Sequence, residues 1–261
     1  MSNLPAIQSQ VKSDATNNLL ARALGYADVN DTRAVAEAKK YASSVLTTIE
    51  GDSKLHDLDP RSIVLTMIDA AKFRLEIDGR KLAYIVPYGG KATMQISYKG
   101  FLAKLKEQYP DMSYTAEMVF DGDQFDVRDD AGFQTYTHVK ADPFQTDDKK
   151  LKGVFVSLAW TDNGTKNQKI NIVPKSDLDK MRSKSKGGNW SDWYSQMAIK
   201  SAVKRACKIH FAAISTLAEM SDYDNIQNVI KTDSVTDAGK PNIIDNLNSQ
   251  IIDAEVKESN E

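Results

Sequence analysis

The sequence predicts an α+β fold, with helices packed on a central antiparallel β-sheet and hairpins. Apolar residues recur at three-to-four spacing toward both ends of the chain, which is typical of helices that cover a core. The middle of the chain carries short alternating segments separated by Asp and Gly turns, which indicates antiparallel strands. Because these strands do not alternate with helices, a doubly wound parallel sheet is disfavoured.

Two helices are predicted before the first strand. Asp31 or Thr32 can cap a helix that continues to Glu50, where Gly51 stops it. A second helix is expected to start after Asp59, because a capping residue is followed there by proline at the first helical position.

A hairpin and a helix are predicted next. We expect strands at 82–86 and 93–98, a turn between them at 87–91, and a helix over 99–108. Five further strands are predicted, at 114–120, 125–128, 133–139, 153–160 and 169–173. Asn163-Gly164 between the last two is a strong hairpin signal, because these residues tolerate the positive φ of a tight turn.

The C-terminal part returns to a helical pattern and then loses it. Helices are predicted over 176–184 and 191–210, with Gly187-Gly188 between them. The resulting domain organisation is a flexible segment over 1–30, a core over 31–220 and an acidic, largely disordered tail over 221–261.

Composition excludes several classes of protein. The single cysteine, Cys207, rules out a disulfide scaffold and a cysteine-based zinc site. No apolar stretch approaches the roughly 18–20 residues of a membrane span. The first residues show no basic region followed by an apolar run, so no export signal is expected. A cytoplasmic setting is therefore predicted.

The formal net charge of −2 hides large local imbalances. Residues 72–108 carry 8 basic and 3 acidic side chains, and residues 174–210 carry 9 and 3. Residues 111–148 carry 10 acidic and 2 basic side chains, and residues 211–261 carry 10 and 3. A partner responds to the potential within about one Debye length, roughly 8–10 Å, so the two basic segments are candidate contact surfaces. The alternative is that they are ordinary solvated faces.

No enzymatic motif is complete. Gly89-Gly90-Lys91 resembles the end of a phosphate-binding loop, but Ile85 stands where its first glycine belongs and Ala92 where its Ser or Thr belongs. The three histidines form no metal-binding motif. Asp121 and Asp123 are candidate magnesium ligands of a nuclease, although such residues beside glycine more often make turns. We expect no catalytic site.

Nucleic-acid binding has better support, because the basic segments also carry aromatic residues and glycines. Between residues 87 and 100, Lys91 and Lys99 can meet phosphates, while Tyr88 or Tyr98 can stack on bases. Glycines such as Gly100 permit a close approach of the backbone. The alternative is a hairpin whose tyrosines cover the core.

The second basic segment offers a loop and a helix. Arg182, Lys184 and Lys186 stand at alternate positions before the glycine pair, which favours a loop that grips a DNA backbone, with Trp190 beside it. In the following helix, three-to-four spacing produces one stripe, formed by Trp193, Met197, Lys200, Lys204 and Lys208. This stripe is a candidate cationic track. Trp193 either stacks on a base or, as we favour, packs at the start of the helix.

Three motifs in this order resemble the phage and prophage RecT family of single-strand annealing proteins. They are the run Pro-Tyr-Gly-Gly-Lys to Gln-Ile-Ser-Tyr-Lys-Gly-Phe at 87–101, Val-Phe-Asp-Gly-Asp-Gln-Phe at 119–125, and the Ser-Lys-Ser-Lys-Gly-Gly-Asn-Trp block with its following helix at 183–205. The resemblance covers roughly residues 55–217.

The resemblance implies an ATP-independent protein of homologous recombination. Such a protein coats single-stranded DNA left by a partner 5′→3′ exonuclease, oligomerises into rings or helical filaments, and anneals the strand to its complement. A bacterial host cell is implied. We interpret the tail as a segment that contacts a host single-strand-binding protein, as an acidic segment that competes with DNA for the groove, or as an inert one. No cofactor is expected; magnesium would assist the duplex without a dedicated site in the protein.

By position, the resemblance implies a set of residues that line or support the DNA groove: Tyr98, Lys99, Gly100, Lys184, Trp190, Trp193, Lys200, Lys204 and Arg205. Lys91, Arg182 and Lys186, taken from the charge pattern, complete the predicted site. Two alternatives remain at this point. One is a magnesium-dependent nuclease, and the other is a passive coating protein that binds single strands but slows annealing.

Overall fold

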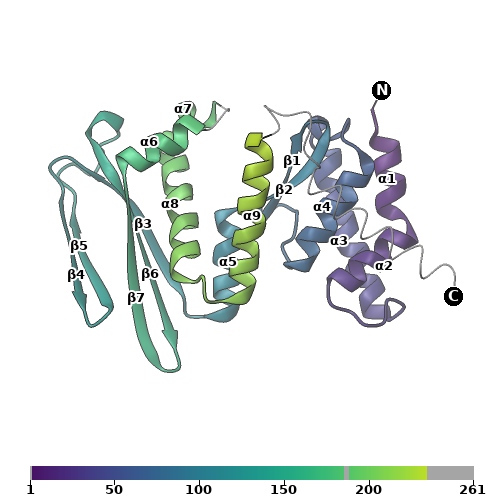
Figure 1. The fold of residues 1–261 in the computed structure, drawn as a ribbon, viewed down its shortest axis with the longest axis horizontal. Coiled ribbons are helices and arrows are strands. Elements are labelled where there is room, and N and C mark those ends of the chain that lie inside the picture. Colours follow the sequence, from purple (N-terminus) through teal and green to yellow (C-terminus); the bar gives the residue numbers. More distant parts are fainter. Residues whose placement is uncertain (1, 185–187, 234–261) are drawn as a thin grey trace. The chain divides into compact units, whose positions relative to one another are not determined.

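The computed structural model describes residues 2–184 and 188–233. It divides the chain into two units, Met1–Asp224 and Asn225–Glu261, and the fold described here is that of the first. The predicted α+β class is confirmed, because helices flank strands that all pair in antiparallel fashion (Figure 1). The strands form three separate small sheets rather than one central sheet.

The first part of the fold is helical. Its elements are α1 (Leu4–Lys12), α2 (Asp14–Ala23), α3 (Thr32–Glu50), the short 3-10 helix η1 (Ser53–Leu55) and α4 (Pro60–Lys72). Both predicted helices are confirmed, with the predicted caps. The Asp31 carboxylate accepts hydrogen bonds from the first backbone amides of α3, and the Asp59 carboxylate accepts one from Ser62 at the start of α4.

The predicted flexible segment over 1–30 is wrong for most of its length. Residues 4–23 form α1 and α2, and Ile7, Val11 and Leu20 are fully buried against α3 and α4. The two helices are amphipathic with only a narrow apolar stripe, so their many polar residues masked the helical period. Burial of this stripe stabilises them as part of the core.

The first hairpin leads directly into a helix. Strands β1 (Ala83–Tyr88) and β2 (Lys91–Ile96) are joined by Gly89 and Gly90, whose φ values of +53° and +77° fit a tight two-residue turn. Helix α5 (Tyr98–Gln108) follows, because Ser97 accepts a hydrogen bond from the Gly100 amide and caps it. Tyr98 therefore begins a helix, whereas the sequence predicted it as the end of a strand.

A three-stranded sheet forms the second part of the fold. Its order is β3-β6-β7, from β3 (Ser113–Phe120), β6 (Leu151–Asp162) and β7 (Thr165–Pro174). The predicted hairpin between the last two strands is confirmed at Asn163-Gly164. A separate hairpin, β4 (Gln124–Asp130) and β5 (Phe133–Val139), packs on one face around Phe155, and the short helix η2 (Asp148–Lys150) precedes β6.

Helices cover the other face of this sheet. They are α6 (Lys175–Lys184) and α8 (Tyr194–His210). The short helix α7 (Asn189–Asp192) between them contacts α8, and α9 (Ser215–Asp233) follows. The predicted helix over 191–210 is interrupted at Trp193, whose φ of −134° and ψ of 44° are not helical. Cys207 of α8 is fully buried against the sheet.

The predicted tail begins too early. Residues 221–233 continue α9, and Met220 and Asp224 are buried, so the helix belongs in part to the core. Residues 234–261, the rest of the predicted tail, lie outside the described residues. Within the described part of the chain, no helix has the length and apolar character needed to cross a bilayer.

Gly100 provides a test of the packing between the hairpin and α5. A Cβ atom added there would lie 2.5 Å from the Leu82 carbonyl oxygen and 3.1 Å from Ile96. We expect Gly100→Ala to lower the free energy of unfolding by about 1–2 kcal/mol, because over-packing outweighs the helical preference of alanine. Urea denaturation measures this change.

The matched control is Gly79→Ala, where nothing lies within 4 Å of the added Cβ and φ is not positive. This variant should be neutral or gain up to about 1 kcal/mol through the unfolded state. Equal stability of the two variants would contradict the packing role of Gly100.

Candidate nucleic-acid interface

The start of α5 presents Tyr98 and Lys99 beside the β1-β2 hairpin. The Ser97 hydroxyl donates to the Lys81 carbonyl at 2.7 Å, which ties the helix start to the segment before β1. Tyr98 is partly buried against the core, whereas Lys99 and the hairpin residue Lys91 are exposed. Gly100 is buried, so it supports this arrangement by its close packing and does not face solvent.

Two tyrosines from other elements lie within electrostatic range of Tyr98. Tyr84 on β1 is 42% exposed and Tyr114 on β3 is 43% exposed. Burial raises the pKa of Tyr84 and of Tyr114, and the nearby Tyr98 hydroxyl raises both further. Cys207 also contributes to the raised pKa of Tyr114, and β3, which carries Tyr114, contacts α8. We call Tyr84, Tyr98 and Tyr114 the tyrosine row.

The sequence analysis found Tyr98 and missed the other two. Strand alternation carried the signal for Tyr84, because Ala83 and Ile85 on either side of it point into the core. Tyr114 offered no such signal, because its link to Tyr98 joins two different elements, β3 and α5. Tyr88, the other candidate for stacking, is partly buried on the hairpin.

The two tryptophans at α7 differ in exposure. Trp190 is only 5% exposed, and its ring meets Tyr194 edge-on at 5.6 Å, so it supports the site without offering a face to a base. The expectation that Trp193 packs is wrong, because it is 59% exposed. Its position at the break between α7 and α8 turns its side chain away from the core.

Two basic groups flank the ring of Tyr194. Lys175 Nζ lies 5.7 Å and the Arg182 guanidinium 5.6 Å from its centroid. Burial, followed by the hydrogen bond to Asp179, raises the pKa of Tyr194. Arg182 and Lys184 are exposed at the end of α6, while Lys186 lies outside the described residues.

The stripe on α8 divides into an exposed and a paired part. Lys200 is exposed. Lys204 and Lys208 both bind Asp224 of α9, each at 2.6 Å. Arg205 pairs with Asp177 at 3.0 Å, and this bond holds the pKa of Asp177 below its usual range. Lys204 and Arg205 were predicted to contact DNA, but in this structure their charges are satisfied within the protein.

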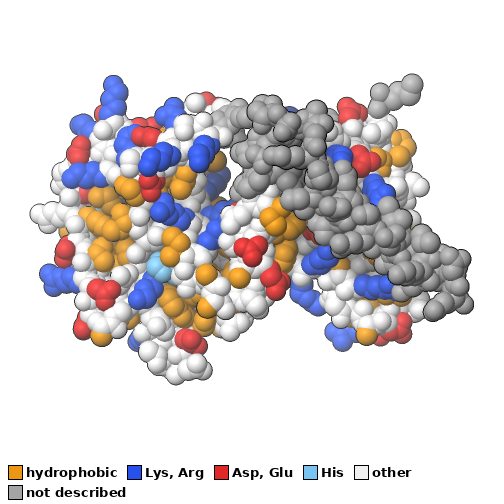
Figure 2. All heavy atoms as spheres, viewed as in Figure 1, with side chains coloured by type: hydrophobic (Ala, Val, Ile, Leu, Met, Phe, Trp, Pro, Cys, Tyr) orange, Lys and Arg blue, Asp and Glu red, His pale blue; other side chains and the backbone are white. Residues whose placement is uncertain are grey.

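Figure 2 shows where these cations lie on one face of the protein. Lys and Arg side chains gather over α6 and α8, with Asp and Glu side chains among them. The predicted basic segment of residues 174–210 is thus a surface of mixed charge.

The two aspartates considered for a nuclease have structural partners within the protein. Asp123 accepts hydrogen bonds from the backbone amides of Phe120 and Ala141, and its Oδ2 lies 3.2 Å from His138 Nε2. Burial alone would raise the pKa of Asp123, but these hydrogen bonds hold it below its usual range. Asp121 faces Lys152 at 3.7 Å. Within residues 2–184 and 188–233, no group of three or more His, Cys, Asp or Glu side chains is arranged to hold a metal.

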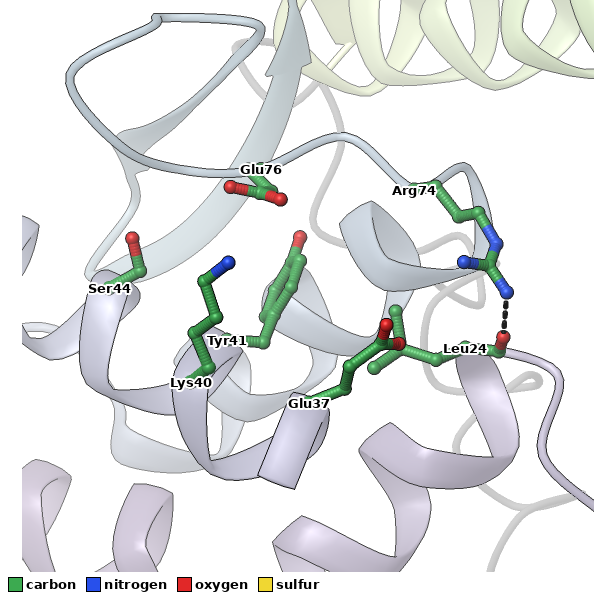
Figure 3. A pocket seen from close by; sticks show the side chains of 7 residues that line it. All are labelled: Leu24, Glu37, Lys40, Tyr41, Ser44, Arg74 and Glu76. Atoms are coloured by element: carbon green, nitrogen blue, oxygen red, sulfur yellow. Dashed lines mark hydrogen bonds between the residues drawn. The ribbon is translucent and has the colours of Figure 1, made fainter. Parts of the chain in front are cut away.

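A pocket of about 130 Å³ lies elsewhere, beside α3 (Figure 3). Lys40 and Tyr41 point toward Glu76, while Arg74 turns to the Leu24 carbonyl and donates to it at 2.5 Å. The Tyr41 hydroxyl donates to the Leu75 carbonyl. These bonds tie α2, α3 and the end of α4 together, and no residue of the predicted DNA site lines the pocket.

Comparison with known proteins finds the family that the three motifs resemble. The model of the RecT family matches residues 39–237, which is well over half of the chain. A similar protein, the uncharacterized protein YqaK of Bacillus subtilis (strain 168), is 38% identical over 66 residues. That match covers 25% of this chain and 23% of the relative, so the likeness to YqaK extends over about a quarter of each. The family match carries the assignment: the chain belongs to the RecT family.

Proposed function

We propose that this protein binds single-stranded DNA and anneals it to a complementary strand without ATP, in homologous recombination. The observation that carries the proposal is the tyrosine row beside the exposed Lys99, because aromatic faces and cations together form a surface for an unpaired strand. Lys91, Lys184, Lys200 and Trp193 extend the set of exposed cations and aromatic rings on neighbouring elements.

The mechanism follows from the chemistry of these side chains. The lysines neutralise phosphates and release counterions, while the tyrosines hold bases apart from one another and open to pairing. Contacts to the backbone carry little sequence information, so a complementary strand of any sequence can pair. Stacking in the new duplex supplies about 1.4 kcal/mol per step, so nucleotide hydrolysis is not needed. Magnesium would act on the duplex and requires no site in the protein.

The family also motivates a proposal about partners. We propose a homo-oligomer, as a ring or filament on DNA, that receives its strand from a 5′→3′ exonuclease. The exposed side chains of Phe144, which is 87% exposed, Val139 and Ile172 offer apolar surface to another copy. Residues beyond 233 are proposed to contact a host single-strand-binding protein.

The central prediction is annealing without a nucleotide. Purified protein should accelerate pairing of two complementary oligonucleotides in the absence of ATP, because phosphate neutralisation removes the repulsion between strands. Quenching of a fluorophore on one strand by a partner on the other measures the rate. A rate equal to the protein-free reaction would refute the function.

Measurements on the same oligonucleotides distinguish an annealing protein from a nuclease and from a passive coating protein. A nuclease would shorten a labelled strand when magnesium is added, whereas an annealing protein leaves its length unchanged. A passive coating protein would bind the strand and slow pairing below the protein-free rate.

Exposed lysines should account for part of the salt dependence of binding. Replacing Lys99 and Lys200 by Ala should weaken binding and reduce the slope of log K against log salt by about 1.4, since each phosphate contact on single strands contributes about 0.7. The control is the pair Lys12→Ala and Lys39→Ala, two exposed lysines of α1 and α3. An unchanged slope for the first pair would place the DNA path elsewhere.

The tyrosine row should act through stacking. Tyr84→Leu and Tyr114→Leu should each weaken binding of a single strand by about 1–3 kcal/mol, while Tyr84→Phe and Tyr114→Phe, which keep the ring, should bind nearly as the original protein does. Fluorescence anisotropy of a labelled oligonucleotide measures both. Equal effects of Leu and Phe would show that stacking is not the cause.

A further inference from the structure

Asp224 of α9 binds two lysines of α8 at once. Its Oδ1 accepts a hydrogen bond from Lys204 Nζ and its Oδ2 accepts one from Lys208 Nζ, each at 2.6 Å. The Asp224 side chain is 4% exposed, whereas those of the lysines are 21% and 20% exposed. Both ammonium groups also lie over the ring of Phe101 in α5, 5.7 and 5.8 Å from its centroid. Helices α5, α8 and α9 meet at this point (Figure 1).

This arrangement has the chemistry of a phosphate site. Residues four apart on a helix share a face, so Lys204 and Lys208 present their ammonium groups side by side. Each holds one oxygen of the same anion, and a phosphodiester also presents two non-bridging oxygens. Lysine binds phosphate as a compact point charge. The Asp224 carboxylate thus occupies the position that a backbone phosphate would take.

Lys204, one of the two lysines, lies close to the start of α5, where Tyr98 of the tyrosine row is found. Lys204 Nζ also donates to the Ile96 carbonyl at 3.0 Å, two residues before Tyr98. Burial lowers the pKa of Lys204, and Asp224 acts in the opposite direction. The ammonium form of Lys204 therefore gains from an anion at this position, whichever molecule provides it.

Helix α9 has a second attachment that does not involve the lysines. The Tyr223 hydroxyl donates to Asp69 of α4 at 3.3 Å, and its ring packs edge-on against Phe73 at 5.9 Å. Asp224 is consequently not the sole anchor of α9, and its carboxylate can leave the lysines while Tyr223 remains in place.

We propose that Lys204 and Lys208 form a binding site for a backbone phosphate of single-stranded DNA, which Asp224 occupies while DNA is absent. Helix α9 then competes with the strand for these two lysines. A strand that delivers a phosphate displaces the carboxylate and loosens α9 around Asp224. The inference rests on the proposed function, because the phosphate belongs to the bound strand.

Replacement of the competing carboxylate tests the inference. Asp224→Asn keeps the shape of the side chain and removes its charge. Asp222→Asn is the matched control, since Asp222 is an exposed acid two residues earlier and its loss changes the net charge equally. At moderate salt, Asp224→Asn should bind an oligonucleotide about tenfold more tightly than Asp222→Asn, with a salt slope steeper by about 0.7 per phosphate gained. Adding Lys204→Gln and Lys208→Gln to Asp224→Asn should abolish the gain.

Each outcome separates this inference from the proposed function. If the original protein binds and anneals DNA but Asp224→Asn binds no more tightly than Asp222→Asn, Asp224 only holds α9 in place and the inference fails. If the original protein neither binds nor anneals DNA, the result refutes the proposed function, on which this inference rests.

Hydrogen exchange keeps the test independent of the variant's folding. In the unaltered protein, saturation with single-stranded DNA should speed amide exchange in α9 around residues 220–226, because the strand displaces Asp224. Slower or unchanged exchange there would count against displacement, even if Asp224→Asn does not fold.

Discussion

The packing of α8 on the three-stranded sheet determines where the candidate contact residues lie. Much of the buried side of α8 is made of small residues: Ala198, Ala202 and Ala206 are fully buried, and α8 contacts all three strands of the sheet. Small side chains let the helix axis approach the sheet closely, so the helix cannot rotate without leaving a void. With this face fixed, Lys200 must point outward and Lys204 must reach toward α5. The positions of the cations on α8 thus follow from the packing of three buried alanines.

The ion pairs show which of the charges behind the near-zero net charge are paired within the fold and which are exposed. Some cations of the basic segments are neutralised within the fold, as in the pairs Arg205–Asp177, Lys175–Asp179 and Lys204–Asp224. Others, such as Lys99 and Lys200, stay exposed. A sum over the sequence cannot separate these groups, although only the second is presented directly to a partner. The local potential, and not the total, is the quantity that a strand of DNA meets.

Local signals predicted much of the fold. Asp31 and Asp59 capped the expected helices, and Asn163-Gly164 made the expected turn, because each of these features depends on neighbours in sequence. The failures have tertiary causes. The N-terminal helices α1 and α2 were missed because their narrow apolar stripe becomes stable only against α3 and α4. Trp193 was expected to pack at the start of the helix because its helical spacing gave no sign of the backbone break at this residue, where it is 59% exposed.

The candidate site was predictable only in part, for the same reason. Tyr98 and Lys99 stood out beside glycines, whereas Tyr114 comes from a strand distant in sequence. Asp224 lies 16 and 20 residues from the lysines that it pairs with, and no local pattern links an acid of one helix to the cations of another.

Because Cys207 is buried, the reactivity of its thiol depends on the packing of α8. The thiol has no exposed surface, and burial raises its pKa to about 12, so it stays protonated near neutral pH. The thiolate is the reactive form, so an alkylating reagent modifies this cysteine only when α8 separates from the sheet. Because Cys207 is the only cysteine of the chain, the rate of alkylation of the whole protein reports the opening of the one helix that positions the cationic stripe.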